Sequence, residues 1–338
     1  MKKSIDYRSD TLTQPSAEMR ERMAHASVGD DVYGEDPSIN QLEQTAAQLL
    51  GKQAGLFVSS GTQGNLLAIL GHCQRGDEYI SGDGYHVYSK EAGGAAVLGG
   101  IASTALATGK QFEVPVDSLH QAIKSDDIHH SVSRLLCLEN TVHGRVQSLS
   151  HLRALCDLAH ESGLLTHLDG ARLMNAAIAE GISATEISAP FDSISLCLSK
   201  GLGAPIGSVL CGSTKFINKA RRNRKLLGGG TRQAGILAAG GLYALEHNIE
   251  RLIDDHSNAE QLAKGLASLQ MMPVEQYTNM VFISPPAEHI TPLCDYLRDN
   301  GISMTEDMPT MRMVTHLDIN SDDIATTIGA FKDYFSSL

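Results

Sequence analysis

The segment Phe-Asp-Ser-Ile-Ser-Leu-Cys-Leu-Ser-Lys, residues 191–200, is typical of a buried strand that ends on a lysine, and Gly-Leu-Gly-Ala-Pro-Ile-Gly follows it directly. Partial desolvation at the end of an apolar strand favours the neutral amine, the form that attacks a carbonyl in Schiff-base chemistry. The glycines at 201, 203 and 207 would let a ligand approach the backbone closely. Alternatively, Lys200 only extends its ammonium from the strand end into water. The motif alone leaves both interpretations open.

A carboxylate closes a second apolar strand upstream. In Gly-Leu-Leu-Thr-His-Leu-Asp-Gly-Ala-Arg (163–172), Asp169 stands at the carboxyl end, where open α/β sheets place their ligands. An aspartate and a lysine on separate strands suit pyridoxal phosphate, whose ring nitrogen takes a carboxylate partner while a lysine holds its aldehyde. Alternatively, Asp169 would cap the helix that the following residues predict.

A short strand, a turn of small residues and a helix are predicted in Gly-Leu-Phe-Val-Ser-Ser-Gly-Thr-Gln-Gly-Asn-Leu-Leu-Ala-Ile-Leu (55–70). The backbone N–H groups of Gly61 and Thr62, the Thr62 hydroxyl and the helix dipole would all face a phosphate. The same turn also suits an ordinary helix cap. Neither the Gly-rich dinucleotide fingerprint nor a P-loop occurs in the chain, which disfavours nicotinamide and nucleoside-triphosphate enzymes.

Composition and charge narrow the class of protein. The 338 residues carry a formal charge of −12 and no Lys/Arg-rich tail, which argues against nucleic-acid binding. The six cysteines have no metal or redox spacing and are expected to be reduced core residues. The first residues contain no apolar signal segment, so we expect a cytoplasmic protein that does not span a membrane.

Apolar strands alternate with helices along most of the chain. The expected strands are 55–58, 78–81, 95–98, 135–138, 164–168, 193–198 and 207–211, and the expected helices are 38–50, 62–73, 149–162 and 231–247. Because most of these strands are apolar on both faces, the pattern predicts an α/β fold with a mostly parallel seven-stranded sheet covered by helices on both faces. We expect a large domain over 1–247, whose segment 1–37 contributes to the active site, and a smaller α+β domain over 248–338.

Several ordered motifs resemble the aspartate-aminotransferase type of pyridoxal-phosphate enzyme, fold type I. They are the phosphate turn, Gly-Tyr-His-Val-Tyr-Ser-Lys-Glu-Ala-Gly-Gly (84–94), Leu-Glu-Asn-Thr (138–141), His-Leu-Asp-Gly-Ala-Arg (167–172), Ser-Lys-Gly-Leu-Gly (199–203) and Gly-Gly-Gly-Thr-Arg-Gln (228–233). Within that group, residues 7–15, 28–37 and 311–318 resemble the low-specificity L-threonine aldolases, and the resemblance spans nearly the whole chain.

The resemblance implies a catalytic role for four residues. Lys200 would hold the cofactor, and Asp169 would keep its ring nitrogen protonated. His86 would stack on the ring and remove the β-hydroxyl proton of the substrate, directly or through a water. His129 would contact the β-substituent, from this subunit or from a neighbouring one, although the adjacent His130 leaves that assignment open.

The other implied residues bind charged groups. Arg172 and Arg312 offer the planar fork that suits the substrate carboxylate, with the Ser9 hydroxyl assisting. The expected cofactor-binding set is Gly61, Thr62, His86, Asp169, Arg172, Ser199, Lys200 and Arg232. Arg232 would reach the phosphate of a neighbouring subunit's cofactor, so the resemblance implies a homo-oligomer, either a dimer with shared sites or a homotetramer. No metal is expected. Lys90 stands where an apolar residue would better line a side-chain pocket, so side-chain preference stays open.

The function that the resemblance implies is retro-aldol cleavage of L-threonine, L-allo-threonine and other β-hydroxy-α-amino acids to glycine and an aldehyde, which is acetaldehyde for threonine. Another fold type I enzyme, such as an aminotransferase or a β-eliminating lyase, would share Lys200, Asp169 and the phosphate turn. A catalytically silent protein that binds pyridoxal phosphate is a third interpretation. Loss of His86 or of the carboxylate clamp would indicate it, and both are present.

Overall fold

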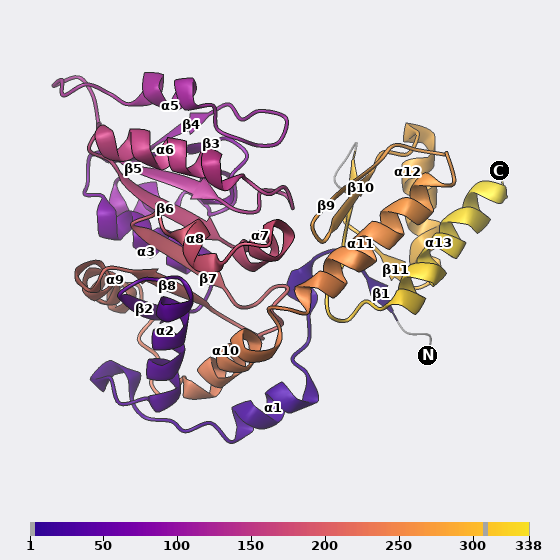
Figure 1. The fold of residues 1–338 in the computed structure, drawn as a ribbon, viewed down its shortest axis with the longest axis horizontal. Coiled ribbons are helices and arrows are strands. Elements are labelled where there is room, and N and C mark those ends of the chain that lie inside the picture. Colours follow the sequence, from indigo (N-terminus) through magenta and orange to yellow (C-terminus); the bar gives the residue numbers. More distant parts are fainter. Residues whose placement is uncertain (1–3, 307–309, 338) are drawn as a thin grey trace.

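A computed structural model describes residues 4–306 and 310–337. Residues 1–3, in the N-terminal stretch where no apolar signal segment was found, lie outside the described residues. The chain forms two lobes joined by a narrow connection, a larger one built on a seven-stranded sheet and a smaller one at the carboxyl end (Figure 1).

The large sheet confirms the expected fold class. Its strands, in spatial order, are β2 (Ala54–Val58), β8 (Ser208–Gly212), β7 (Ser193–Cys197), β6 (Leu165–Gly170), β5 (Val132–Glu139), β3 (Asp77–Gly82) and β4 (Ala102–Leu106). Only β8 runs antiparallel to its neighbours β2 and β7, and the remaining pairs are parallel. The carboxyl ends of β5, β6 and β7 therefore meet at one edge of the sheet.

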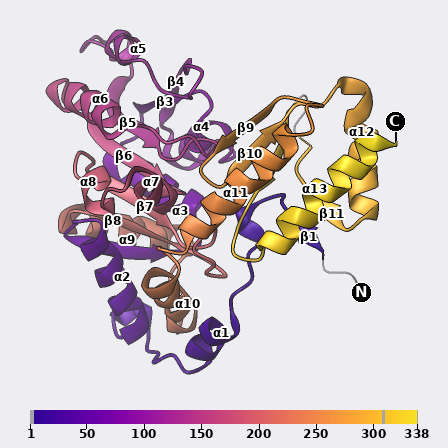
Figure 2. The ribbon, with the colours of Figure 1, turned by 45° about the vertical axis from the view of Figure 1, so that its right-hand side comes forward.

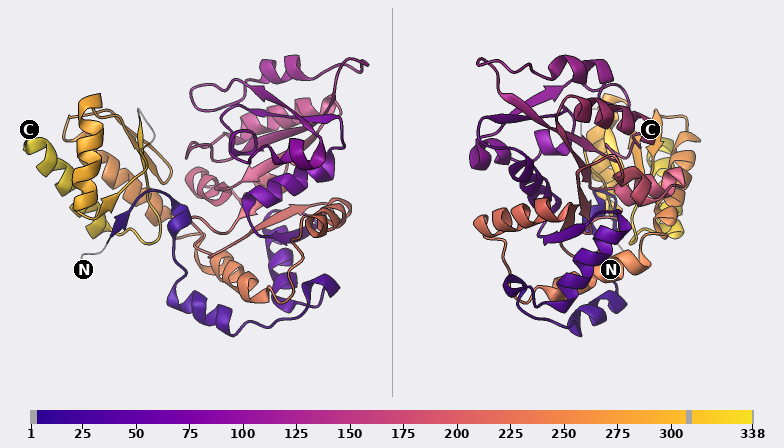
Figure 3. Two further views of the ribbon diagram at one scale, coloured as in Figure 1. Left: turned by 180° about the vertical axis from the view of Figure 1, so that it is seen from behind. Right: turned by 60° about the vertical axis from the view of Figure 1, so that its left-hand side comes forward.

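Helices cover both faces of this sheet, as the apolar strands require. The longer ones are α2 (Pro37–Leu49), α3 (Gly61–His72), α6 (Leu149–Glu161), α9 (Thr214–Leu226) and α10 (Gly235–His247). Successive side chains of β2 point to opposite faces of the sheet. Leu56 and Val58 pack with α3 and α9 on one face. Phe57 belongs to the cluster on the other face, which includes Ile39 and Leu42 of α2. In Figure 1, α6 lies in front of the sheet and α3 behind it, and the view from behind agrees (Figure 3).

Shorter elements connect these layers. They are the helices α1 (Ala17–Ala24), α4 (His86–Ser89), α5 (Val116–Ala122), α7 (Leu173–Glu180) and α8 (Ala184–Ser188), with the 3₁₀ turns η1 (Asp10–Leu12) and η2 (Asp31–Tyr33). All six cysteines are buried and free, as expected. Within residues 4–306 and 310–337, no helix combines the length and the apolar character needed to cross a membrane.

The expected strand at 95–98 is wrong. Ala95–Gly99 form a π-helical turn, η3, which ends at Gly100 with a φ of 61°, and the strand comes later as β4. A short apolar run cannot be assigned to strand or helix by periodicity, and glycines at both ends of this one favour a turn. Val97 and Leu98 are 78% and 53% exposed, so of this run only Ala95 is buried within the described chain.

The small lobe has its own core. It contains the antiparallel strands β9 (Val274–Tyr277), β10 (Met280–Ile283) and β12 (Met311–Val314), the helices α11 (Leu252–Ala267), α12 (Ala287–Asp299) and α13 (Ser321–Ser336), and a parallel pair made by β1 (Ile5–Asp6) and β11 (Ile302–Ser303). Figure 2 shows β1 lying beside β11, although they come from opposite ends of the chain. Ile5 and Tyr7 belong to this second core. We propose a domain boundary near residue 248, with the first strand packed on the second domain.

Candidate active site

Lys200 lies in a tight turn directly after β7. Its carbonyl oxygen accepts hydrogen bonds from the Gly203 N–H at 2.8 Å and from the Thr13 hydroxyl at 3.1 Å. Gly203 has a φ of 76°, a left-handed conformation that favours glycine at this position. The turn is thus tied both to itself and to the N-terminal segment, which fixes the backbone that carries the amine.

Asp169 lies near the carboxyl end of β6 and is 3% exposed. Its Oδ1 accepts from the Ala171 N–H at 2.9 Å, and its Oδ2 accepts from Asn65 Nδ2 at 2.7 Å. The following helix α7 has Arg172 at its N-cap and no side-chain cap bond, so Asp169 is not that helix's cap. A buried carboxylate held by two donors is suited to face a protonated ring nitrogen.

His86 begins α4 and is anchored at two points. Its backbone N–H donates to Glu139 Oε2 at 2.7 Å, and its Nδ1 lies 2.8 Å from Glu91 Oε1. The bond to Glu91 raises the pKa of His86, against the opposing effect of burial. Burial and, to a smaller extent, the charge of Asp169 raise the pKa of Glu139 to about 8, although the His86 N–H and the positive charges of His86 and Lys200 act the other way. These groups are therefore electrostatic neighbours.

One amide links the two carboxylates at this edge. Asn65 Nδ2 donates to Asp169 at 2.7 Å and to Glu91 Oε1 at 2.8 Å, while Asn65 Oδ1 lies 3.1 Å from His167 Nε2. Single ligand atoms of His86, Glu91 and Asp169 all lie within 4.8 Å of one another, a spacing that a metal ion could also use. The two Asn65 bonds account for this spacing without a metal, and the expectation of no metal stays a prediction.

The residues expected to bind a phosphate, Gly61 and Thr62, lie in the first turn of α3. The Ser60 hydroxyl caps the helix by accepting from the Gln63 N–H at 3.1 Å, and Gly61 and Thr62 are the first two helical residues. A Cβ on Gly61 would stand 3.7 Å from the hydroxyl of Ser208. That hydroxyl is buried and has no hydrogen-bond partner in the described part of the chain. An unsatisfied buried hydroxyl beside a helix N-terminus fits a phosphate.

Arg172 forms an ion pair with an aspartate of the same chain. Its Nε and Nη2 donate to the two oxygens of the fully buried Asp10, at 2.8 and 2.6 Å. Burial acts to raise the pKa of Asp10, but the charge and hydrogen bonds of Arg172, with the charge of Lys200, outweigh it and lower the value. Because this edge of the Arg172 guanidinium is occupied, a substrate carboxylate would have to meet its other edge.

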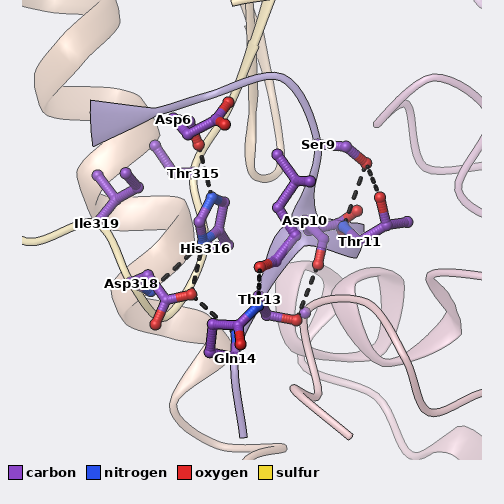
Figure 4. Close-up of polar contacts among 12 residues, drawn as sticks. Asp6, Ser9, Asp10, Thr11, Thr13, Gln14, Thr315, His316, Asp318 and Ile319 are labelled. Atoms are coloured by element: carbon purple, nitrogen blue, oxygen red, sulfur yellow. Dashed lines mark hydrogen bonds and ion pairs between the residues drawn. The ribbon is translucent and has the colours of Figure 1, made fainter. Parts of the chain in front are cut away.

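The N-terminal segment connects the small lobe to the Lys200 turn through the Thr13 hydroxyl. Figure 4 shows its contacts with His316 and Asp318 of the small lobe. The Asp6 carbonyl lies 2.8 Å from His316 Nε2, and the Gln14 N–H donates to Asp318. Between these contacts, the Ser9 hydroxyl accepts from the Thr11 hydroxyl at 2.9 Å. Ser9 is therefore carried on a segment held at both ends.

Arg312 lies in β12, and its Nη2 donates to the Arg8 carbonyl at 3.1 Å. Burial lowers the pKa of His143, and the charges of Arg312, Arg145 and Arg172 lower it further, so His143 is neutral among three guanidinium groups. Ser199, beside Lys200, has its hydroxyl 3.7 Å from Cys197 Sγ.

Two expected site residues do not join this group within the chain. His129 is 79% exposed and bonds Asp127 in the loop before β5, whereas the site lies at the other end of that strand, roughly 25 Å away at about 3.3 Å per residue. Arg232 is more than half exposed and pairs with Asp30 at 3.0 Å. Their predicted roles would need a second subunit.

Four buried residues around the site have no role predicted from the sequence. They are Asp10, Asn65, Glu91 and Glu139. Glu139 stands in the Leu-Glu-Asn-Thr motif, and Asn65 lies three residues after Thr62, on the helix that begins at the phosphate turn. Helical spacing of three from the phosphate turn was the available signal for Asn65. Asp10 and Glu91 likewise lie within quoted motifs, 7–15 and 84–94, but neither stands at the end of an apolar strand.

The chain is similar to known proteins over most of its length. The family model described as beta-eliminating lyase matches residues 6–287. Low specificity L-threonine aldolase of Escherichia coli is 44% identical over 332 residues, covering 98% of this chain and 99% of that protein. Low-specificity L-threonine aldolase 1 of Arabidopsis thaliana is 39% identical over 343 residues, covering 98% and 96%. Among solved structures, the threonine aldolase of Leishmania major superposes with a TM-score of 0.85 at 19% identity, covering 98% and 99%.

Proposed function

The chain belongs to the low-specificity L-threonine aldolase family, and from that premise we propose that it is a pyridoxal-phosphate-dependent carbon–carbon lyase that cleaves L-threonine to glycine and acetaldehyde. L-allo-Threonine and other β-hydroxy-α-amino acids are the further substrates. The observation that carries the proposal is the proximity of Lys200, Asp169 and His86 at one edge of the sheet. Beside them a helix N-terminus lies near a buried hydroxyl that has no hydrogen-bond partner among the described residues.

Each group at this edge has a separable task toward the cofactor. Lys200 would hold its aldehyde, Asp169 would face its ring nitrogen, and Gly61, Thr62 and the Ser208 hydroxyl would bind its phosphate. Bound pyridoxal phosphate supplies an electron sink for the pair of electrons released when the Cα–Cβ bond breaks. The Asn65 and Ala171 donors hold the Asp169 carboxylate in the position from which it would face the ring nitrogen.

The substrate's own groups meet the remaining residues. His86 removes the β-hydroxyl proton through Nε2, because its Nδ1 is already bonded to Glu91. Arg312 binds the substrate carboxylate, with Ser9 assisting and Arg172 offering its outer edge. His143, neutral beside these arginines, adds a hydrogen-bonding group without adding charge.

Product analysis tests the activity. The purified enzyme, loaded with pyridoxal phosphate, is incubated with L-threonine, and glycine, acetaldehyde, 2-oxobutanoate and ammonia are measured together. We expect glycine and acetaldehyde in equal amounts. A β-eliminating enzyme would instead release 2-oxobutanoate and ammonia, an aminotransferase would need a keto-acid acceptor, and a silent binding protein would form no product. Any of these three results would refute the proposal.

We also propose that the enzyme works as a homo-oligomer, with Arg232 and His129 serving a neighbouring site. The loop of Tyr33 packs on the loop of Arg232, since the Asp31 N–H donates to the Arg232 carbonyl at 3.2 Å. Beside them lies a cavity of about 500 Å³. Exposed apolar residues surround the region, with Tyr33 76% and Leu226 80% exposed. Exposed apolar surface of this kind is typical of an interface, and Ile128, next to His129, is 97% exposed as well.

Light scattering on the eluting protein tests this assembly. We expect a dimer or a tetramer that binds cofactor, and a mixture of His129→Ala and Lys200→Ala subunits that regains activity because some sites then hold both native residues. A monomer with full activity would refute shared sites.

A further inference from the structure

Glu91 enters the reaction proposed above only through its bond to His86, yet it is held at the site by several contacts. Its side chain is only 7% exposed and lies against the His86 ring. A single oxygen, Oε1, is 2.8 Å from both His86 Nδ1 and Asn65 Nδ2. Burial raises the pKa of Glu91, while the bonds to His86 and Asn65 oppose that rise and the charge of Asp169 adds to it.

The direction of each hydrogen bond behind Glu91 can be settled by counting protons. If the Asn65 amide oxygen faced the two carboxylates, oxygen would oppose oxygen, so Nδ2 faces them and Oδ1 faces His167. An amide oxygen only accepts, so His167 Nε2 carries the proton and its Nδ1 accepts from the Ser193 hydroxyl at 2.9 Å. Ser193 then accepts from His72 Nε2 at 2.8 Å.

This chain of donors runs in one direction, toward the carboxylates. Burial lowers the pKa of His72 to about 4 and of His167 to about 3, so both rings are neutral and each has a single N–H to give. In this arrangement every hydrogen bond of the network joins one donor to one acceptor. The network therefore fixes the position of Asn65, and Asn65 fixes the oxygen of Glu91 that meets His86.

The same counting applies to His86. When Glu91 is ionised its carboxylate only accepts hydrogen bonds, and the bond between Oε1 and the ring then requires the proton to sit on Nδ1. A neutral ring with its proton on Nδ1 leaves Nε2 as a bare acceptor, and Nε2 is the atom that can take a proton. The charged and titratable groups that influence this ring are Glu91, Asp169 and Lys200.

We propose that Glu91 is a positioning residue that holds His86 in the tautomer with a bare Nε2 and stabilises the imidazolium formed when Nε2 takes the substrate's β-hydroxyl proton. This inference rests on the proposed function. In the step, the O–H bond breaks, an N–H bond forms at Nε2, and the positive charge that appears on the ring faces the Glu91 carboxylate. An aspartate supports a catalytic histidine in the same way in serine proteases.

The test is Glu91→Gln, measured as the loaded enzyme by two independent readouts. Nitrogen-15 NMR of labelled histidine, with the His86 signals assigned through His86→Asn, reports which ring nitrogen carries the proton. We expect Nδ1 in the native enzyme and a partial or full shift to Nε2 in Glu91→Gln. We also expect kcat for threonine to fall by roughly 10–100-fold, with KM changed less than about threefold.

A double-mutant cycle separates positioning from general damage. If Glu91 acts through His86, Glu91→Gln should slow the enzyme little further when His86→Asn is already present. The matched control is Glu78→Gln, which removes another buried glutamate that is bonded by Lys124 and Ser133 at the opposite end of the sheet. It should leave the His86 signals unchanged. Glu91→Asp, which keeps the charge but withdraws it from the ring, serves if the glutamine variant does not fold.

Each outcome decides the matter. An unchanged His86 tautomer in Glu91→Gln, or an equal loss of kcat on the His86→Asn background, would overturn the inference. The NMR readout does not depend on the reaction catalysed. A native enzyme that fails to release glycine and acetaldehyde would thus refute the proposed function, while the tautomer measurement still judges Glu91.

Discussion

Replacing Asp10 with asparagine would leave the Arg172 guanidinium buried opposite a neutral group. Asp10 is fully buried, the Arg172 side chain is 13% exposed, and two parallel hydrogen bonds of 2.8 and 2.6 Å join them. Asn279 Nδ2, from the small lobe, also lies 3.4 Å from Asp10. The substitution keeps the shape and removes the charge, so the cost is that of an uncompensated buried cation.

The same chain contains a matched control. Asp6 and Arg8 form an equally regular pair, with bonds of 2.9 and 2.6 Å, but their side chains are 26% and 58% exposed. Breaking a buried pair by removing one partner costs about 3–5 kcal/mol. An exposed pair contributes only about 0.2–1 kcal/mol. Asp10→Asn should therefore destabilise the protein by at least about 2 kcal/mol more than Asp6→Asn.

Urea unfolding of both variants, followed by circular dichroism with saturating cofactor, measures this difference through the transition midpoints. A carboxyl whose folded-state pKa is lowered stabilises the fold above its ordinary value of 3.8, and this contribution is lost as the pH falls through the lower folded value. The difference in unfolding free energy between the native enzyme and Asp10→Asn should stay constant from pH 5 to 8 and become smaller below about pH 3.8. Equal midpoints for Asp10→Asn and Asp6→Asn would refute the reasoning.

Three further predictions concern the site. Asp169→Asn should retain cofactor but lose roughly three orders of magnitude in turnover, about 4 kcal/mol in the barrier, and turnover near the native rate would rule out its role at the ring nitrogen. Arg312→Lys should raise KM for threonine by the equivalent of about 1.5–3 kcal/mol, with the cofactor absorbance unchanged, because the two parallel donors are lost. If KM does not move, the carboxylate is bound elsewhere. Dialysis against a chelator should leave both cofactor content and kcat intact, and a loss restored by a divalent cation would place a metal among His86, Glu91 and Asp169.

The parts of the structure that could be predicted from the sequence are those with local causes. A lysine or an aspartate at the end of an apolar strand must emerge at the edge of the sheet, so Lys200 and Asp169 were placed by strand polarity alone. The helix start at which we propose a phosphate site is likewise local, because Ser60, Gly61 and Thr62 are consecutive. The order of apolar strands was sufficient for the sheet class but failed at 95–98, where glycines on both sides outweigh the apolar run.

The rest depends on contacts between distant parts of the chain. Asp10 meets Arg172 across 162 positions, and Asn65 meets Asp169 across 104, so no pattern in a window of sequence could pair them. Packing of Ile5 in the small lobe is set by strand pairing with Ile302. The predicted roles of His129 and Arg232 need surfaces of a second subunit, which one chain does not contain.

The position of the covalent link to the cofactor tests the central claim most directly. The loaded enzyme is reduced with borohydride and digested, and the peptide that carries the added mass of reduced pyridoxal phosphate is identified by mass spectrometry. The account predicts one modified peptide, with the label on Lys200, and no label in Lys200→Ala. A label on another lysine, or a reducible link that persists in Lys200→Ala, would contradict it.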